Sequence, residues 1–587
     1  MSRWWPWLGA LSIGFHLWLI FAGLIPNLVS RPLHMALALP WVLLWQSERP
    51  QSTLSRLTAW IVCALGVAAC IWIAWHEAIL SDQYGSLSGP LQTAIAAVLL
   101  VCVVEMARRA VGWPLPLLAA VALVYGLYGQ HIPGEFGHAG TPLNSFLGTL
   151  TIAEGGLWGS LTGVSVSIVA IFVIFGAILN AGQAGAGFMN VAAAAAGRLT
   201  GGGAKVSVVS SALFGSISGS ASANVASTGA ITLPAMTRLG YPRSLAAAVE
   251  AVASSGGQIM PPLMGAGAFV MVELTGVPYN SIMVAAALPA ILYFLAVWIG
   301  INAYARRYDL PAVPAEQRPD RKTVLVTAGF FMVPFSILLW GMFRLGYTPQ
   351  YAACLAIISA GLLLFTDDRL RFSPRETLNR WVGALTAAGR QISMIAAIIL
   401  CASIIIGVLG ITGLGVKITS SILSGSGGML WPAVLLTALA CLLLGMEVPT
   451  TAAYVICVAV AAPALTDLGL GLLQTHLFVF WFALLSTITP PVCGAVFIAA
   501  GMVQENWLRV ATKAMALGIG LYLIPLSMIA NPALIELAER PVAALGAAAQ
   551  TAIAVGLISF GMIAPSHWLK RLLLIVGGTV ILFIRAG

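Results

Sequence analysis

The stretch SGGQIMPPLMGAGAF, residues 255–269, decides the fold, because it interrupts a long apolar run. Proline lacks a backbone N–H donor and clashes with the preceding turn, so the adjacent Pro261 and Pro262 should break a helix. Four glycines in the same stretch make a continuous helix still less favourable. Lipid offers no partners to freed backbone groups, so a break at membrane depth needs a structural reason.

The composition places this break in a membrane protein. Of the 587 residues, 60% are hydrophobic and only 8% are charged, whereas soluble proteins carry about 25% charged residues. Lipid tolerates only helices and closed barrels, so the sequence predicts an all-α polytopic membrane protein. Apolar runs of spanning length recur along the chain, for example at residues 7–29, 58–75, 282–298, 324–340 and 475–500.

The basic residues are confined to alternate loops. Residues 306–322 carry five Lys and Arg residues and residues 367–380 carry four, whereas residues 76–90, 130–156 and 467–474 carry none. Cytoplasmic loops are enriched in Lys and Arg. We therefore expect a multi-pass membrane protein with a cytoplasmic N-terminus.

The Pro-Pro stretch has a partner much later in the chain. IMPPLMGA at residues 259–266 matches ITPPVCGA at residues 488–495 without a gap. This match pairs Pro261 with Pro490, and we call the pairing of positions at this constant offset the repeat register. Upstream of each stretch lies a helical hairpin, at about residues 206–236 and 431–465.

The two hairpins are expected to have opposite orientations. The positions of the basic loops place the first hairpin on the cytoplasmic side and the second on the outer side. Inverted repeats with paired discontinuous helices are typical of secondary transporters.

Both hairpins are expected to be re-entrant. Residues 215–229 of the first hold five Ser, Thr228, Asn224 and three Gly, and the flanking apolar arms are each under ten residues, too short to span. The second is expected to break at residues 445–451. Carbonyls freed by the two Pro-Pro pairs would bind a cation, and helix N-termini at the tips would face an anionic substrate. The alternative is that each Pro-Pro pair merely kinks a packed helix.

These motifs resemble the membrane component of the tripartite ATP-independent periplasmic (TRAP) transporters. The resemblance is carried by the stretch SGSASANVASTGAITLPAMTRLGYPRSLAAAVEAVASSGGQIMPPLMGAGAF, by GMEVPTTAAY, by HLFVFWFALLSTITPPV and by the late NPAL. It is closest to the fused type, in which small and large subunits form one chain and TAXI-type binding proteins are the usual partners. It implies small-subunit-like scaffold helices at 1–130, a large-subunit-like region at 131–540 and extra C-terminal membrane segments at 541–587.

The resemblance also implies a location, the bacterial inner membrane, and a mechanism. Members are elevator-type importers driven by an ion gradient, most often of sodium and otherwise of protons, and a periplasmic binding protein delivers the substrate, commonly an organic acid. No cofactor is expected, and no metal other than a coupling sodium ion. The ion sites carry over to Ser218, Ser220, Asn224, Ser254, Ser255, Gly256 and Gly257 in one half and to Gly445, Thr450, Thr451, Ser486, Thr487 and Thr489 in the other. The substrate contacts carry over to Ser220, Ser222, Asn224, Thr450 and Thr451.

Two acidic residues are candidate coupling acids. Glu447 stands where family members usually have a small residue, which puts the identity of the coupling ion in doubt. Glu250 lies two turns inside from Arg243, and the alternative to a coupling role is an ion pair with that arginine. Intramembrane acids are functional by default.

Two other classes of protein fit the sequence less well. A re-entrant-loop channel is the first, but channel filters are built from identical loops around one axis, whereas these two loops differ and enter from opposite sides. An intramembrane enzyme is the second, but the sequence has no HExxH motif. The sequence also lacks a GxxxxGK[ST] loop, so the chain itself is not expected to hydrolyse ATP. A secondary transporter without enzymatic activity is therefore predicted.

The charge asymmetry of the loops predicts their sidedness. A cysteine introduced in place of Gly471 should react with a membrane-impermeant thiol reagent from the periplasm, and one in place of Pro314 only from the cytoplasm. Labelling of both positions from one side would remove the basis for the inverted orientation of the two hairpins.

Overall fold

The computed structural model describes residues 4–45, 53–445, 448–491 and 493–584, and helices joined by loops make up these ranges. They contain no strand, only an isolated bridge between Thr366 and Phe372. Nine of the helices in these ranges are long and apolar enough to cross a membrane. The predicted all-α polytopic membrane fold is confirmed.

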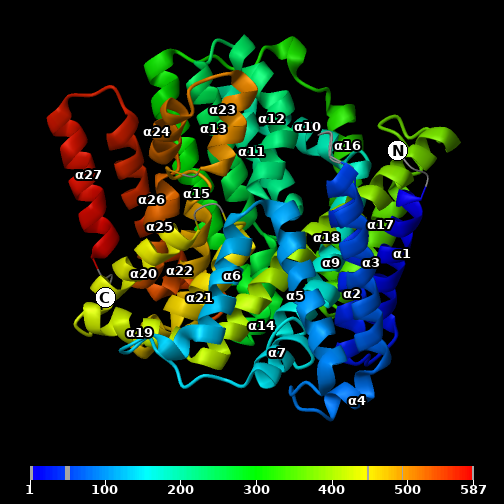
Figure 1. Cartoon of the computed structure of the whole chain (residues 1–587). Helices are drawn as coiled ribbons and strands as arrows, with labels where there is room; N and C mark the ends of the chain where they lie inside the picture. The colour runs from blue at the N-terminus through cyan, green and yellow to red at the C-terminus, as the bar shows by residue number, and fades with distance from the viewer. Residues whose placement is uncertain (1–3, 46–52, 446–447, 492, 585–587) are drawn as a thin grey trace.

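The N-terminal helices extend from the right edge of the molecule to its middle in Figure 1. They are α1 (Trp5–Phe21), α2 (Asn27–Leu44), α3 (Thr53–Trp75), α4 (Glu77–Ser81), α5 (Gly89–Val111) and α6 (Pro114–Tyr128). The apolar run at residues 7–29, expected as a single span, is instead two helices. The chain turns at Gly23, whose φ of 82° is left-handed. Pro26 directly precedes the first residue of α2, a position at which its fixed φ suits the start of a helix.

These helices pack on the centre of the molecule. The longest helix, α18 (Pro374–Thr412), contacts α1, α2, α5 and α6 on one side and α9 (Ala170–Ala181) on the other. The remaining helices of this part are α7 (Leu143–Thr151), α8 (Ser160–Val164), the π-helical turn η2 (Ser165–Val169), α10 (Ala184–Ala196), α16 (Arg321–Phe343), α17 (Pro349–Leu363) and α19 (Leu414–Gly425).

A buried chain of hydrogen bonds joins α1 and α2 to η2. His16 Nε2 lies 2.8 Å from His34 Nδ1, and His34 Nε2 lies 3.0 Å from Ser165 Oγ. At the other end His16 Nδ1 lies 2.6 Å from the carbonyl of Ser12, which can only accept. With both rings neutral the chain has one direction: Ser165 donates to His34, His34 to His16, and His16 to Ser12.

The predicted internal repeat is visible in the helix boundaries. The first repeat holds α11 (Gly202–Ser218), α12 (Ala221–Arg238), α13 (Arg243–Gly256) and α14 (Ala266–Thr275). The second holds α20 (Leu430–Leu444), α21 (Thr450–Asp467), α22 (Leu472–Leu485) and α23 (Gly494–Val503). The repeat register pairs the first residues of α12 and α13 with the first residues of α21 and α22. The bonds Pro261–Pro262 and Pro490–Pro491 are both cis.

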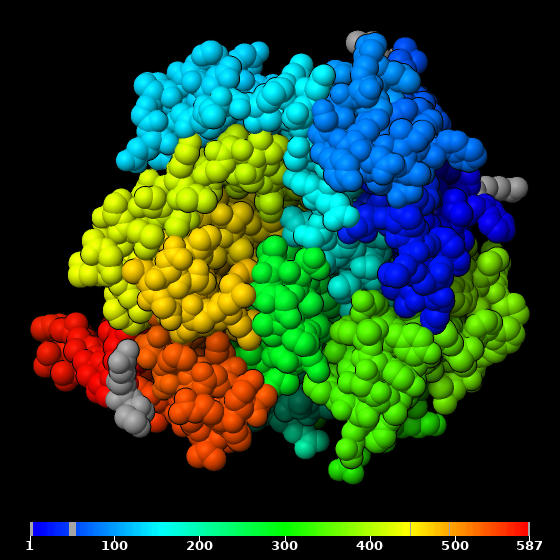
Figure 2. All heavy atoms as spheres, turned by 90° about the horizontal axis from the view of Figure 1, so that it is seen from below, coloured from blue at the N-terminus to red at the C-terminus, as the bar shows by residue number. Residues whose placement is uncertain are grey.

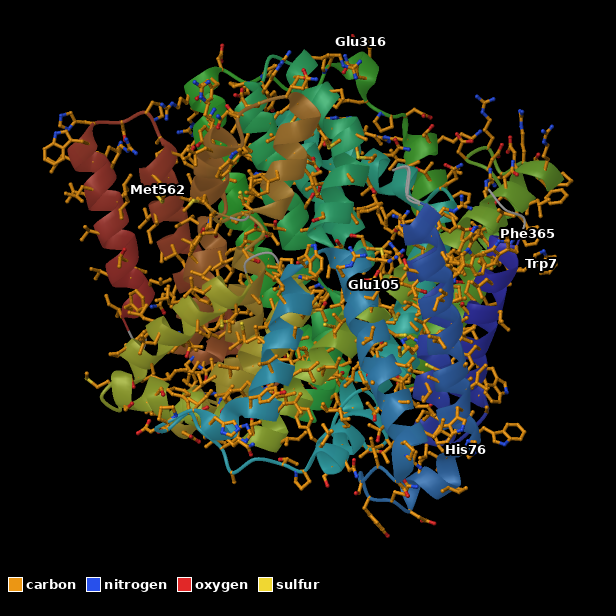
Figure 3. The ribbon with its side chains drawn as sticks, in the orientation of Figure 1. Trp7, His76, Glu105, Glu316, Phe365 and Met562 are labelled. Atoms are coloured by element: carbon orange, nitrogen blue, oxygen red, sulfur yellow. The ribbon has the colours of Figure 1, made fainter. Side chains whose placement is uncertain are left out.

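The two repeats have opposite orientations. In Figure 1 the hairpin α11–α12 and helix α13 lie in the upper half with α14 below, whereas α20, α21 and α22 lie in the lower half with α23 above. The loop that contains Glu316 is at the top of the molecule and the turn at His76 is at the bottom (Figure 3). The Lys- and Arg-rich loop at residues 306–322 therefore lies opposite the Lys- and Arg-free loop at residues 76–90.

The first hairpin differs from the expected one in its interior. Its arms are 17 and 18 residues long, and only Gly219 and Ser220 interrupt the helices, whereas the sequence suggested short arms around a polar middle. The polar side chains are accommodated within the helices because their hydroxyls find partners inside the protein: Ser216 donates to the carbonyl of Leu213 about one turn back, and Thr228 donates to Glu250 of α13. In the second hairpin α20 ends at Leu444, and Thr450 and Thr451 already belong to α21.

The last helices surround these repeats. Helix α15 (Tyr279–Tyr308) packs on α13, and α24 (Trp507–Leu517) and α25 (Ile519–Ala530) pack on α13 and α22 respectively. The C-terminal pair α26 (Pro541–Ile563) and α27 (Trp568–Phe583) packs on α15 and α25, at the left edge of Figure 1. Short 3-10 turns lie at Gly129–His131, Gly257–Ile259 (η3), Ala315–Gln317 and Pro532–Ile535.

The histidine chain predicts coupled stability effects. His16→Leu and His34→Leu should each lower the free energy of unfolding by about 1–3 kcal/mol, because each leaves a buried ring nitrogen without its partner. The double variant should lose less free energy of unfolding than the two single variants together, and the difference should be about 0.5–3 kcal/mol. Unfolding of the purified protein in detergent measures these values.

His76→Leu, just beyond the C-terminal end of α3, is the control. It should be additive with His16→Leu to within about 0.5 kcal/mol. If the effects of His16→Leu and His34→Leu were also additive to within about 0.5 kcal/mol, the two histidines would not be coupled, and this would contradict the buried chain of hydrogen bonds.

Candidate functional site

The tip of the first hairpin packs tightly on the break that follows α13. A β-carbon built on Gly215 would lie 2.3 Å from Cα of Gly257, so only glycine permits this approach. Asn224 bridges the same junction: its Nδ2 donates to the carbonyls of Ser211 at 2.9 Å and Ser254 at 3.4 Å. Hairpin and broken helix are thereby held together at the predicted first ion site.

The break itself is tied to the tip through Gln258. Its Nε2 donates to the carbonyl of Gly219 at 3.2 Å, and its own backbone carbonyl accepts the N–H of Gly265 at 2.8 Å. Gly219 has a left-handed φ of 59°, which glycine adopts without the steric cost that a β-carbon would add. The hydroxyl of Tyr279 lies 2.8 Å and 2.6 Å from the carbonyls of Pro262 and Leu263. Part of the hydrogen-bonding capacity freed by the Pro-Pro pair is therefore used inside the protein.

The second repeat builds a similar junction and meets the first. A β-carbon on Gly445 would lie 3.3 Å from the β-carbon of Ser486. Thr487 Oγ1 hydrogen-bonds to Ser255 Oγ at 2.9 Å, a direct link between the two breaks from opposite halves of the chain. Thr489 Oγ1 lies 2.6 Å from the hydroxyl of Tyr522 on α25. Of the predicted ion-site residues, Ser255 of the first half and Thr487 of the second are thus in direct contact.

The predicted substrate residues lie at two helix N-termini. Ser220 caps α12, and its Oγ accepts the N–H of Ala223 at 3.4 Å. Thr450 and Thr451 form the first turn of α21 and are half-buried. Ser218 is half-buried and Ser222 is exposed, whereas Asn224 is fully buried. Helix N-termini carry a partial positive charge, which favours an anion. Glu447 lies outside the described residues.

The two hairpins differ in exposure. One face of α12 is exposed along several turns, and its residues include Ser222, Ala226, Ser227, Ala230, Ile231 and Pro234. The corresponding helix α21 is buried along most of its length. Figure 2 shows the molecule from below. The green segment near residue 280 fills the middle of this lower face, beside the yellow residues of the second repeat. The first hairpin is therefore exposed on its second helix, α12, whereas the second hairpin is exposed on its first helix, α20, for example at Leu439 and Leu443.

Glu250 is the centre of a buried hydroxyl cluster. Its Oε2 accepts from Ser207 at 2.7 Å and Thr232 at 2.5 Å, and its Oε1 accepts from three further hydroxyls, those of Ser211, Thr228 and Ser254. In the described part of the chain no basic side chain lies within ion-pair distance of it. The alternative ion pair with Arg243 is therefore wrong. The carboxylate joins α11, α12 and α13, and it touches Ser254 of the candidate ion site.

This cluster has no counterpart in the second repeat. The repeat register pairs Glu250 and its five donors with Val479, Leu436, Ala440, Cys457, Ala461 and Ala483. The carboxylate and all its hydroxyl donors are replaced together by apolar side chains or a thiol. The two repeats share a backbone, but only the first holds a charge at this depth.

Sequence reasoning missed two residues of this region. Ser211 supplies a carbonyl to Asn224 and a hydroxyl to Glu250, and Gln258 connects the tip to the break. The repeat contained a signal for Gln258, because the repeat register pairs it with Thr487, which was already a candidate. For Ser211 the sequence held no such signal, since its contacts depend on helix packing.

Comparisons with known proteins agree with this geometry. The family model described as the tripartite ATP-independent periplasmic transporter, DctM component, matches residues 98–542, well over half of the chain. The C4-dicarboxylate TRAP transporter large permease protein DctM of Pseudomonas aeruginosa is 25% identical over 337 residues, 57% of this chain and 76% of that protein. The Vibrio cholerae protein of the same name is 24% identical over 439 residues, 71% of this chain and 92% of that protein.

A further relative also matches. The isethionate TRAP transporter permease protein DctMQ of Oleidesulfovibrio alaskensis is 24% identical over 476 residues, 76% of this chain and 72% of that protein. These similarities concern transporters, not enzymes.

The hydroxyl cluster predicts a graded loss of stability. Glu250→Ala should lower the free energy of unfolding by more than about 3 kcal/mol, because Ser207, Ser211 and Ser254 each lose a buried acceptor at about 1 kcal/mol or more. Thr232→Val removes one donor and should cost about 1 kcal/mol. Glu316→Ala, at an exposed position, should stay within about 0.5 kcal/mol of the parent in the same detergent unfolding measurement. Equal effects of Glu250→Ala and Glu316→Ala would contradict the conclusion that Glu250 holds α11, α12 and α13 together.

Proposed function

We propose that this chain, which belongs to the DctM component family of the tripartite ATP-independent periplasmic transporters, imports a small organic acid by secondary active transport. An ion gradient, of sodium or of protons, drives the uptake. Movement is of the elevator type: the two hairpins and the broken helices carry the substrate past a scaffold that includes α1–α6. The protein lies in the inner membrane with its N-terminus in the cytoplasm.

The observation that carries this proposal is the meeting of the two inverted breaks at the hydrogen bond between Thr487 and Ser255. A substrate placed there is near two helix N-termini of opposite repeats. Such a site in a pseudo-symmetric protein can be exposed to either side in turn, which is the requirement for alternating access.

Chemistry divides the region into an anion part and a cation part. The N-termini of α12 and α21, with Ser220, Ser222, Asn224, Thr450 and Thr451, suit a carboxylate. The breaks, with backbone carbonyls and hydroxyls, suit the coupling cation. The remaining residues proposed for the cation are Ser218, Ser254, Ser255, Gly256, Gly257, Gly445, Ser486, Thr487 and Thr489. Glu250 and Glu447 are the acids proposed to take part in ion coupling.

A soluble periplasmic binding protein is the proposed partner, and the TAXI type is the proposed class. The relatives named for C4-dicarboxylates and isethionate support an organic acid as substrate. The two hairpins differ in sequence and in exposure, and this asymmetry favours a carrier over a symmetric channel filter.

Uptake into liposomes tests this function. With the cognate binding protein present, radiolabelled organic acid should accumulate when an inward sodium or proton gradient is imposed, each varied separately. Without the binding protein, uptake at low substrate concentration should fall to background. Full high-affinity uptake by the chain alone would contradict the tripartite assignment, and gradient-independent equilibration would favour a channel.

A further inference from the structure

One polar atom at the junction of tip and break lacks a partner. The side chain of Gln258 is 3% exposed, and its Oε1 is buried without a hydrogen-bond donor among the described residues. A buried amide oxygen left unpaired costs about 1–3 kcal/mol. This atom lies where the first hairpin meets the broken helix, so its missing partner belongs to the candidate site.

The orientation of the amide identifies the free atom as the oxygen. Nε2 donates to the carbonyl of Gly219 at 3.2 Å. The flipped amide would place two oxygens against each other and leave an N–H group unpaired instead, which is worse on both counts. The atom that points away from Gly219 is therefore an acceptor, and its partner is a cation or a donor, never a carboxylate.

The surrounding backbone favours a cation. Helix α11 ends at Ser218, and α13 with its 3-10 extension η3 ends at Ile259, so two helix C-termini converge on Gln258. Helix C-termini carry a partial negative charge and unpaired carbonyls. Glu250 lies nearby on the same helix, where its Oε1 accepts from Ser254 about one turn before this end.

The repeat supplies an independent argument. The repeat register pairs Gln258 with Thr487, whose Oγ1 reaches across to Ser255 of the first repeat. Both repeats therefore carry a side-chain oxygen at the same position of the break. In the second repeat that oxygen is used between the repeats, and in the first it has no donor among the described residues.

We propose that Gln258 is a ligand of the coupling cation in the first repeat, through its side-chain Oε1. The inference rests on the proposed function, because it assumes that a cation is coupled to transport. Hard cations such as sodium prefer oxygen ligands. Gln258 would add a side-chain oxygen to the backbone carbonyls of the hairpin tip.

Sodium-dependent thermal stabilisation of the purified full chain in detergent tests the ligand. Gln258→Leu removes the oxygen and should raise the sodium concentration for half-maximal stabilisation at least tenfold. Gln258→Glu keeps an oxygen and adds a charge, so it should retain sodium stabilisation at or below the concentration that the parent protein needs. Potassium at equal ionic strength controls for general salt effects.

Gln474→Leu is the matched control. Gln474 is a buried glutamine of the second repeat whose Nε2 donates to Met528 and whose Oε1 accepts from Gly471. Its loss should lower stability equally at all sodium concentrations. The same sodium-independent loss in Gln258→Leu would mean that Oε1 binds only water, and it would overturn the inference while leaving the function intact. A parent protein without any sodium response would overturn sodium coupling itself, and this ligand role with it.

Discussion

A backbone group that leaves a helix at membrane depth must find another partner, and the centre of this molecule is organised by that constraint. The Pro-Pro pair after α13 frees carbonyls, and the hydroxyl of Tyr279 meets two of them. Across the junction, Gln258 of the break donates to the carbonyl of Gly219 at the hairpin tip, and Asn224 of the hairpin donates to the carbonyl of Ser254. The close approach of Gly215 and Gly257 brings these partners within reach. Each of these side chains is explained by the break, and none would be needed in a continuous helix.

The repeat shows how much of the site is shared and how much belongs to one half. Helix starts recur in the repeat register, and a glycine near the hairpin tip packs against the broken helix in both halves. The polar contents differ: Glu250 and its hydroxyl donors correspond to side chains without charge or hydroxyl in the second repeat. Burial of an unpaired carboxylate is unfavourable unless hydrogen bonds compensate, so acid and donors are retained or lost as a group. An inverted fold can therefore be symmetric in backbone and asymmetric in charge.

The N-terminal helices are attached to the rest by polar as well as apolar contacts. The two buried histidines connect α1 and α2 to η2, and Arg109 of α5 donates to the carbonyl of Leu43 in α2. Such bonds are directional, so they specify one register where apolar packing alone would allow several. The physical consequence is that these bonds hold the N-terminal helices in one arrangement against each other and against η2.

The sequence by itself determined the membrane class, the broken helices, the repeat and the family, because composition, proline chemistry and motif spacing are local properties. It also pointed to Asn224, Ser254 and Thr487 through the motifs that surround the breaks. Only the tertiary structure decided that the polar interior of the first hairpin stays helical, because its hydroxyls find partners in the preceding turn or on the neighbouring helix α13. It likewise replaced the expected partner of Glu250, since five hydroxyls from three helices reach the carboxylate and Arg243 does not. Which side chain meets which carbonyl depends on how helices distant in sequence pack, and a linear pattern does not contain that information.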